Sequence, residues 1–191
     1  MKKNIAVFSS GRGGNFNNLC EYFKATESIS VCLLVTSNLN SASKQIADKY
    51  KIETLFANVD VLRSINFTEK LQEKNISLVV LAGFILKIPK SFVIQFAGKM
   101  INLHPSLLPK FGGKGMYGDN VHLAVLESKE RFSGITIHFV DEIYDNGEII
   151  FQKSCHIDNN ETLLTLREKI RKLEYEFFPK VIEQILLKNE C

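Results

Sequence analysis

The stretch Ile101-Asn102-Leu103-His104-Pro105-Ser106-Leu107-Leu108-Pro109 places two polar side chains at the end of an apolar strand. Residues i and i+2 of a strand point to the same face, so Asn102 and His104 lie side by side. Pro105 has no backbone N–H and keeps strand pairing from continuing past them. The stretch therefore predicts an amide and an imidazole held together at the end of a rigid strand.

Upstream of this stretch, apolar runs alternate with helical segments. The run at 77–82 is almost continuously apolar, which is typical of a strand covered on both faces. Alternating strands and helices favour an α/β fold with an open, mostly parallel, twisted sheet. Ligands of such sheets bind beyond the carboxyl ends of the strands, where Asn102 and His104 also lie. Strands are predicted at 5–8, 30–35, 52–57, 77–82 and 100–103, and helices after residue 15, at 41–49, at 67–74 and from Pro89 onward.

Downstream, the pattern changes to an antiparallel edge and a long helix. Residues 132–140 alternate like a strand, and a second strand at 148–157 follows the turn signal Asp145-Asn146-Gly147. These strands are expected to form an antiparallel hairpin at the edge of the sheet. A helix at 121–126 precedes them, and residues 158–160 cap a long amphipathic helix from Glu161 to about Leu187. Since no linker or repeat is found, residues 1–191 are predicted to form a single domain.

Composition excludes several classes of protein. Hydrophobic residues make up 45% and charged residues 24% of the 191, which is ordinary for a soluble globular domain. The net charge of +3 comes without a basic stripe, so nucleic acid is not an expected partner. No apolar segment is long enough to span a membrane. Four cysteines at 20, 32, 155 and 191 form no close pair, which predicts free thiols and a cytoplasmic location. The histidines lack metal-ligand spacing, so no metal is expected.

The first apolar run ends in Ser9-Ser10-Gly11-Arg12-Gly13-Gly14-Asn15, ahead of a helix. Glycines let the backbone approach an oxyanion, and a helix N-terminus supplies free N–H groups. The third glycine of a dinucleotide-binding loop is replaced by Phe16, and Thr36-Ser37-Asn38 stands where an acidic residue would contact a ribose. The loop thus favours a phosphorylated small molecule over NAD; a glycine turn that only packs helix on strand is the alternative.

Asn102, His104 and Asp145 together predict a reaction class. A carboxylate beside His104 would raise the pKa of the imidazole and favour the imidazolium. An imidazolium and an amide donor can stabilise an oxyanion, and a carboxylate with water can accept the proton of an attacking amine. This set favours acyl transfer to an amine without a covalent intermediate. Ser106 is assigned to the turn rather than to nucleophilic attack, His138 to packing or support of the site, and His122 and His156 to the surface.

The run Asn-Leu-His-Pro-Ser-Leu-Leu-Pro-Lys at 102–110, together with Asp145-Asn146-Gly147, resembles the folate-dependent formyltransferase family. The similarity runs from residue 4 to about residue 185, and residues 10–15 are similar to the phosphate loop of members that formylate glycinamide ribonucleotide. The resemblance implies a Rossmann-like formyltransferase fold, 10-formyltetrahydrofolate as co-substrate, and formyl transfer to glycinamide ribonucleotide in purine synthesis, by a monomer or homodimer.

The resemblance also implies roles for individual residues. Asn102, His104 and Asp145 would be catalytic. The substrate would contact Gly11, Arg12, Gly13, Gly14 and Asn15, with Arg171 and Glu174 at its ribose phosphate end, although these last two could instead pair with each other. The pterin pocket would consist of Phe84, Ile85, Leu86, Lys87, Ile88, Asp141, Glu142, Ile143 and Tyr144.

Three positions depart from the family pattern, and other functions stay open. Gly14 stands where relatives carry Ser, Lys87 where an apolar folate contact is usual, and Ser64, next to Arg63, where an arginine would meet the folate tail. Sugar-nucleotide formylation and formyltetrahydrofolate hydrolysis are alternatives, as is an inactive phosphate-binding module. Formylation of tRNA and the hydrolase activity are expected to need further domains. The glycine-rich segment 110–118 is either a mobile cover of the site or a surface connection.

Overall fold

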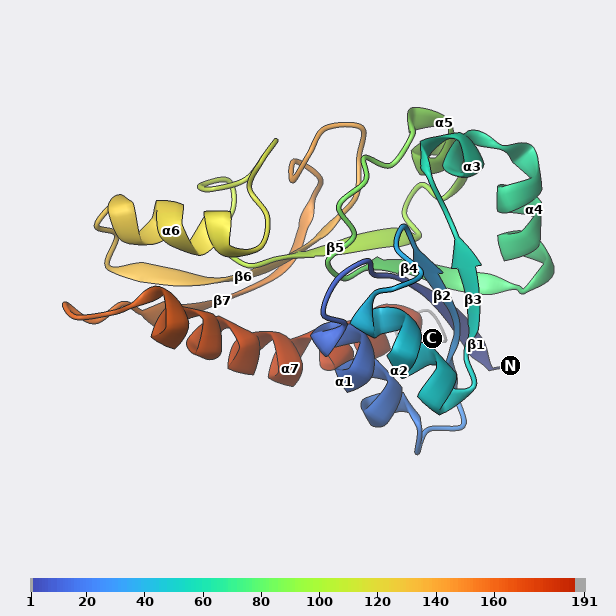
Figure 1. Ribbon diagram of the computed structural model, residues 1–191, viewed down its shortest axis with the longest axis horizontal. Helices are drawn as coiled ribbons and strands as arrows, with labels where there is room; N and C mark the ends of the chain where they lie inside the picture. The colour runs from blue at the N-terminus through green and yellow to red at the C-terminus, as the bar shows by residue number, and fades with distance from the viewer. Residues whose placement is uncertain (1, 188–191) are drawn as a thin grey trace.

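One seven-stranded sheet, in the order β3-β2-β1-β4-β5-β6-β7, organises the protein (Figure 1). The computed structural model describes residues 2–187. Its parallel part consists of β1 (Lys3–Phe8), β2 (Ile29–Thr36), β3 (Glu53–Phe56), β4 (Ile76–Leu81) and β5 (Met100–His104). The predicted α/β class and mostly parallel sheet are therefore confirmed.

The central strands are buried on both faces, as the continuous apolar runs predicted. In β1, Ile5 and Val7 point into one apolar core, while Ala6 and Phe8 point into the other. Helices α1 (Gly14–Phe23), α2 (Ala42–Tyr50) and α7 (Leu163–Leu187) cover the first face. Helices α3 (Val59–Arg63), α4 (Ile65–Glu73) and α5 (Lys90–Gln95) cover the second, at the upper right of Figure 1.

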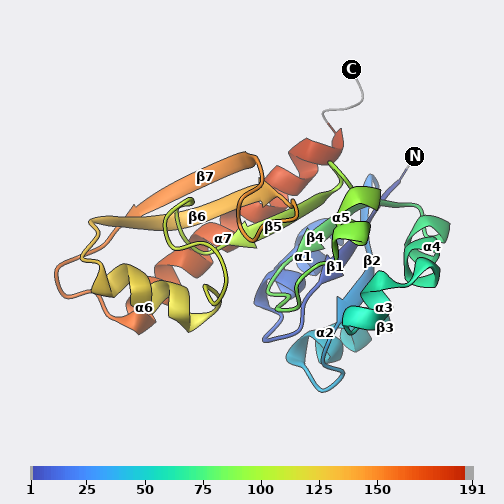
Figure 2. The ribbon, with the colours of Figure 1, turned by 90° about the horizontal axis from the view of Figure 1, so that it is seen from above.

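The antiparallel edge is confirmed and includes β5. Strand β6 (Phe132–Phe139) pairs antiparallel with both β5 and β7 (Ile149–His156). This register sets Asn102 opposite His138 and His104 opposite Thr136. Figure 2 shows the β6–β7 hairpin and α6 (Asp119–Glu127) at the opposite end of the molecule from α3 and α4. The parallel sheet thus changes direction at the strand that carries the two polar side chains.

Two helices differ from the prediction. Helix α3, a short helix that ends at Arg63, was missed. The next residue, Ser64, caps α4, since its hydroxyl accepts a hydrogen bond from Phe67 N at 3.3 Å. Helix α7 begins at Leu163 rather than Glu161, because Thr162 caps it in place of the expected residues 158–160: the Thr162 hydroxyl accepts a hydrogen bond from Thr165 N at 3.3 Å. Predicted and observed bounds of the other elements differ by one or two residues.

The cysteines that the structure describes, Cys20, Cys32 and Cys155, are free, as predicted. Cys191 lies outside the described residues. Among the helices of residues 2–187, none combines the length and apolar character that crossing a bilayer requires.

Candidate active site

A cleft of about 830 Å³ opens where β1, β4 and β5 end. The loops that follow these strands and the segment after β6 form its walls, and α7 closes one side. All the residues predicted for the site line this one cleft. They are Gly11, Arg12, Gly13, Gly14, Asn15, Phe84, Ile85, Leu86, Lys87, Ile88, Asn102, His104, Asp141, Glu142, Ile143, Tyr144, Asp145, Arg171 and Glu174.

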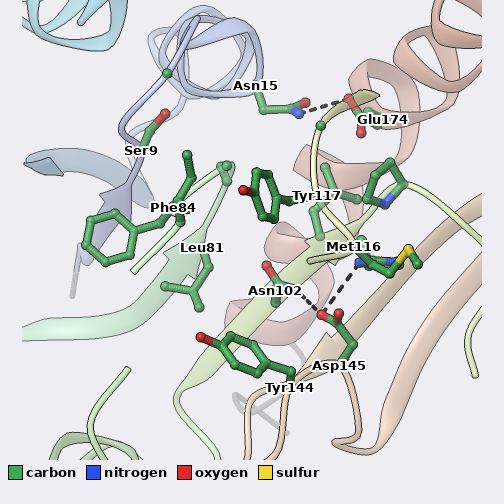
Figure 3. A pocket seen from close by; sticks show the side chains of 18 of the residues that line it. Ser9, Asn15, Leu81, Phe84, Asn102, Met116, Tyr117, Tyr144, Asp145 and Glu174 are labelled. Atoms are coloured by element: carbon green, nitrogen blue, oxygen red, sulfur yellow. Dashed lines mark hydrogen bonds and ion pairs between the residues drawn. The ribbon is translucent and has the colours of Figure 1, made fainter. Parts of the chain in front are cut away.

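Asn102, His104 and Asp145 meet in the cleft. Figure 3 shows Asn102 and Asp145 facing each other there. The Asp145 carboxylate oxygen Oδ1 lies 3.3 Å from Asn102 Nδ2 and 3.5 Å from His104 Nδ1. The other nitrogen of His104, Nε2, donates to the carbonyl of Phe111 at 2.8 Å. Because a carbonyl only accepts, this contact places the proton on Nε2 and leaves Nδ1 facing Asp145.

His138 supports this centre, one of the two roles expected for it. Its Nδ1 lies 2.8 Å from its neighbour's carbonyl, Phe139 O, so the proton sits there and Nε2 accepts. Asn102 Nδ2 donates to that Nε2 at 3.1 Å, and the same nitrogen also contacts Asp145. Both amide hydrogens of Asn102 are therefore occupied. The sequence held a signal for this contact, since a residue paired across β5 and β6 faces the same side as Asn102.

The turn after β6 aims Asp145 into the cleft. Asp145 has φ 54°, in the left-handed region, and its Oδ2 accepts a hydrogen bond from Gly113 N at 2.8 Å. Burial alone would raise the pKa of Asp145. The interactions with His138, His104 and Gly113 outweigh that effect and hold the pKa below its ordinary value. Asp145 is thus a carboxylate at neutral pH.

The prediction that His104 is an imidazolium is wrong, because the pKa of His104 is lowered in this structure. His104 is 3% exposed, and burial lowers its pKa below the ordinary value. The Asp145 carboxylate and the Phe111 carbonyl raise the pKa, but by less than burial lowers it. The reason is desolvation, which disfavours the charged form and which the sequence pattern could not reveal. His104 is therefore mainly neutral at pH 7.

His122 is also misplaced by the sequence, which assigned it to the surface. It is 7% exposed, it lines the cleft from α6, and burial lowers its pKa. Its Nδ1 has no hydrogen-bond partner within residues 2–187. Arg167 of α7, which the sequence did not single out for the site, also lines the cleft, and its Nε lies 3.3 Å from Asp119 Oδ1. His156 is exposed, as predicted.

The glycine loop forms one end of the cleft, at the N-terminus of α1. Gly13 precedes the helix with φ 69°, and a Cβ there would lie 2.9 Å from the backbone Cα of Ser43, so the position requires glycine. Asn15 Nδ2 donates to Glu174 Oε2 of α7 at 3.0 Å (Figure 3). Glu174 therefore forms its hydrogen bond with Asn15 of α1 and not with Arg171. Burial raises the pKa of Glu174 to about 7.

The other end of the cleft is apolar and open. Ile85 is 56% exposed, Ile143 64% and Tyr144 41%, and all three line the cleft. Lys87 Nζ lies 5.3 Å from the centroid of the Tyr144 ring, so its ammonium covers the aromatic face. Exposed apolar side chains gathered in a concave site are typical of a bound ligand. Neither Arg63 nor Ser64 lines this cleft.

A family model described as formyl transferase matches residues 3–182 of this sequence. The chain belongs to the formyl transferase family. Its fold is that of the family: a single α/β domain with a mostly parallel sheet, an antiparallel edge hairpin and a long C-terminal helix.

Formyl transferases of known sequence and structure resemble this chain closely. It is 37% identical to the chloroplastic phosphoribosylglycinamide formyltransferase of Arabidopsis thaliana over 96% of its length, and it spans 65% of that relative. It is 34% identical to the phosphoribosylglycinamide formyltransferase of Bacillus subtilis, covering 96% of this chain and 95% of the relative. A crystal structure of the Anaplasma phagocytophilum enzyme of that name has a TM-score of 0.89 and 30% identity, covering 98% and 88% of the two chains.

The segment 110–118 faces the site of this formyl transferase. Residues 113–118 line the cleft, and the Phe111 carbonyl accepts from His104. This position favours the interpretation as a cover over that of a surface connection. Gly112 packs close to the site as well, since a Cβ there would lie 3.1 Å from Asp145 Cβ.

Proposed function

We propose that this chain transfers a formyl group from 10-formyltetrahydrofolate to the amine of glycinamide ribonucleotide in purine biosynthesis. One observation carries the proposal: Asn102, His104 and Asp145 lie in one cleft between a glycine loop and an apolar end. A phosphorylated amine and a flat, mostly apolar formyl donor would meet at these three side chains. The names of the Arabidopsis and Bacillus relatives support the same acceptor.

The glycine loop is the proposed acceptor end. The N–H groups of the first turn of α1 have no partner within the helix and favour an anion such as a phosphate. Gly11, Arg12, Gly13, Gly14 and Asn15 would hold it there. Glu174, tied to Asn15, offers carboxylate oxygens to ribose hydroxyls, and Arg171 adds positive charge on the same side of the cleft.

The apolar end is the proposed donor end. Phe84, Ile85, Leu86, Lys87 and Ile88 form one wall, and Asp141, Glu142, Ile143 and Tyr144 form the other. A pterin would cover the exposed side chains of Ile85, Ile143 and Tyr144, and its polar edge would bond to backbone groups of the second wall. Lys87 would have to move off the Tyr144 ring if the pterin stacked there.

The chemistry follows from charge balance at the centre. The amine nitrogen attacks the formyl carbon, a new C–N bond forms, and the bond from that carbon to N10 of the folate breaks. The amine proton is taken up by Asp145 or a water it holds, and reaches the neutral His104 at Nδ1. The resulting imidazolium stabilises the oxyanion and returns a proton to N10. Asn102 can donate to the oxyanion once it releases one of its bonds to His138 and Asp145.

A direct assay tests this proposal. Purified protein is mixed with 10-formyltetrahydrofolate and glycinamide ribonucleotide, and release of tetrahydrofolate is followed by absorbance. We expect turnover that depends on the amine. Turnover with a sugar-nucleotide amine or with water alone would replace the proposed acceptor, and no turnover with any of them would indicate an inactive binding module.

We also propose that residues 1–191 act as one formyltransferase domain, as a monomer or homodimer in the cytoplasm. The continuous sheet supports a single domain, and the free thiols of Cys20, Cys32 and Cys155 support a reducing compartment. Sedimentation of the purified chain measures the state of association.

A further inference from the structure

Gly14, the first residue of α1, is packed against a side chain from the far end of the sequence. A Cβ at this position would lie 2.6 Å from the hydroxyl oxygen of Tyr175 on α7. The next ring atom, Cζ, would be 3.6 Å away, an ordinary contact distance. The absence of a side chain at Gly14 therefore makes room for the hydroxyl of Tyr175 and for little else.

Two hydrogen bonds between α1 and α7 hold the backbone that carries Tyr175 beside α1. Asn18 Nδ2 donates to the carbonyl of Tyr175 at 2.9 Å, and Asn15 Nδ2 donates to the adjacent Glu174 at 3.0 Å. The two helices also share one apolar core through Phe16, Leu19 and Ile170. The part of α7 that carries Tyr175 is thus held against α1 next to Gly14.

The Tyr175 hydroxyl is a free donor at the acceptor end of the cleft. The side chain lines the cleft and is 36% exposed. Within residues 2–187 its hydroxyl has no hydrogen-bond partner. The first-turn N–H groups of α1 are directed to the same place, so an anion there would meet backbone donors from α1 and a phenol donor from α7. Asn15 Oδ1, one residue further along α1, is buried and also has no hydrogen-bond partner in the described part of the chain.

We propose that Tyr175 recognises the phosphate of the acceptor by donating its hydroxyl hydrogen to a phosphate oxygen above Gly14. This inference rests on the proposed function for the identity of the acceptor, but the interaction itself requires only a phosphate. Tyr175 is a specificity-determining residue in this assignment: it selects a phosphorylated acceptor and takes no part in formyl transfer. Gly14 is its necessary counterpart, because any side chain there displaces the hydroxyl.

Three variants separate this role from a structural one. Tyr175→Phe removes only the hydroxyl, and we expect the KM for glycinamide ribonucleotide to rise about tenfold with kcat within about twofold, as for a lost bond to a charged group. Gly14→Ser alone should raise the KM similarly, because its Cβ meets the Tyr175 hydroxyl. The double variant moves a hydroxyl from α7 to α1 without that clash, and its KM should return to within about threefold of wild type.

Tyr22→Phe is the matched control. Tyr22 has the same 36% exposure, and its hydroxyl joins α1 to α7 by donating to Glu183, but it does not line the cleft. Its loss should leave the KM unchanged. A second control is the acceptor without phosphate, glycinamide riboside, whose weak turnover should be equal in wild type and Tyr175→Phe. An unchanged KM in Tyr175→Phe, an equal loss with the riboside, or additive losses in the double variant would each overturn the assignment.

Inorganic phosphate distinguishes this inference from the proposed function. If the wild type transfers no formyl group but binds phosphate by calorimetry, and Tyr175→Phe binds it about tenfold more weakly, the Tyr175 assignment stands and the proposed function falls. If the wild type transfers formyl and Tyr175→Phe matches it with both probes, only the assignment falls. Absence of both turnover and phosphate binding in the wild type overturns both.

Discussion

His104 shows how burial, rather than sequence neighbours, decides the protonation state of a side chain that we propose to be catalytic. Its Nδ1 lies 3.5 Å from a carboxylate, which by itself favours the imidazolium. Burial nevertheless lowers the pKa of His104 below its ordinary value. A neutral imidazole with its proton fixed on Nε2 by Phe111 is a base before the reaction and an acid after it. This fits a step in which a proton moves from an amine to a leaving nitrogen.

His104→Ala should leave the fold intact and lower kcat by at least about a hundredfold, the scale of losing one oxyanion donor. The exposed His156, exchanged for alanine in the same way, is the control and should keep full activity. The measurement is tetrahydrofolate release at saturating substrates, with circular dichroism of both variants. Near-normal kcat in His104→Ala would remove it from the mechanism.

Glu174 makes stability depend on pH in a direction that can be stated. Burial raises its pKa to about 7, so the folded state resists its ionisation more than the unfolded chain does. Its contribution is fully present below about pH 4.5 and is lost as pH rises through about 7. Glu174→Gln should therefore match wild type near pH 4 and exceed it by roughly 1–3 kcal/mol near pH 8. Urea denaturation at both pH values measures this, and an equal difference at both would contradict the raised pKa.

At the residue scale, the sequence was enough to identify the polar side chains that lie at strand ends and in the turn of the hairpin. Asn102 and His104 were placed by the period of two in a strand, and Asp145 by its turn signal. His122 was missed because the sequence of α6 does not show which face of the helix is buried. The structure shows that His122 lies on the buried face. Protonation states were out of reach for the same reason, since burial is a property of the fold.

Two elements hold Asp145 from opposite sides. The turn between β6 and β7 supplies its left-handed backbone, and the segment 110–118 supplies the N–H of Gly113. The same segment fixes His104 through the Phe111 carbonyl. A change in the turn would therefore move Asp145, and a change in the segment 110–118 would move both Asp145 and His104.

Gly147→Ala tests the turn. A Cβ at Gly147 would overlap the carbonyl oxygen of Phe139, a backbone atom that cannot move without breaking the hairpin. We expect a loss of roughly 1–3 kcal/mol in the free energy of unfolding and a fall in kcat of about tenfold or more, because Asp145 shifts with the turn. Gly98→Ala is the control: it has φ 70° but open space around it, and it lies outside the cleft, so it should affect stability alone. Full activity in Gly147→Ala would contradict the prediction that the turn positions Asp145.

The elements themselves were largely predictable, because long apolar runs and strong turn signals dominate this sequence. Helix α3 was missed since one turn of five residues has no measurable period. The start of α7 was placed two residues early because several residues before it can cap a helix, and Thr162 rather than residues 158–160 does so. Local patterns therefore predict long elements well, but neither very short helices nor the exact ends of long ones.

At the scale of the whole molecule, the cleft exists because the sheet changes from parallel to antiparallel at β5. The carboxyl ends of the parallel strands lie at one edge of the sheet. The segment between β6 and β7, together with α7, forms the walls of the cleft at that edge. The rule that ligands bind beyond the carboxyl ends of parallel strands predicted from the sequence the edge at which this cleft lies. It could not predict that residues 14 and 175 touch, because such contacts depend on how α7 crosses α1.

A ligand at the acceptor end should therefore contact both α1, near the start of the sequence, and α7, near its end. Asn15 and Glu174, 159 residues apart, already meet across this gap. Glycinamide ribonucleotide at 100 times its Kd should stabilise the fold by about 2.7 kcal/mol and raise Tm by roughly 5–10 °C. Hydrogen exchange should slow in both the 11–18 and the 167–177 segments, since the ligand contacts each. The riboside without phosphate, at equal concentration, should protect far less. Protection confined to one of the two segments would mean that α7 does not contribute to acceptor binding.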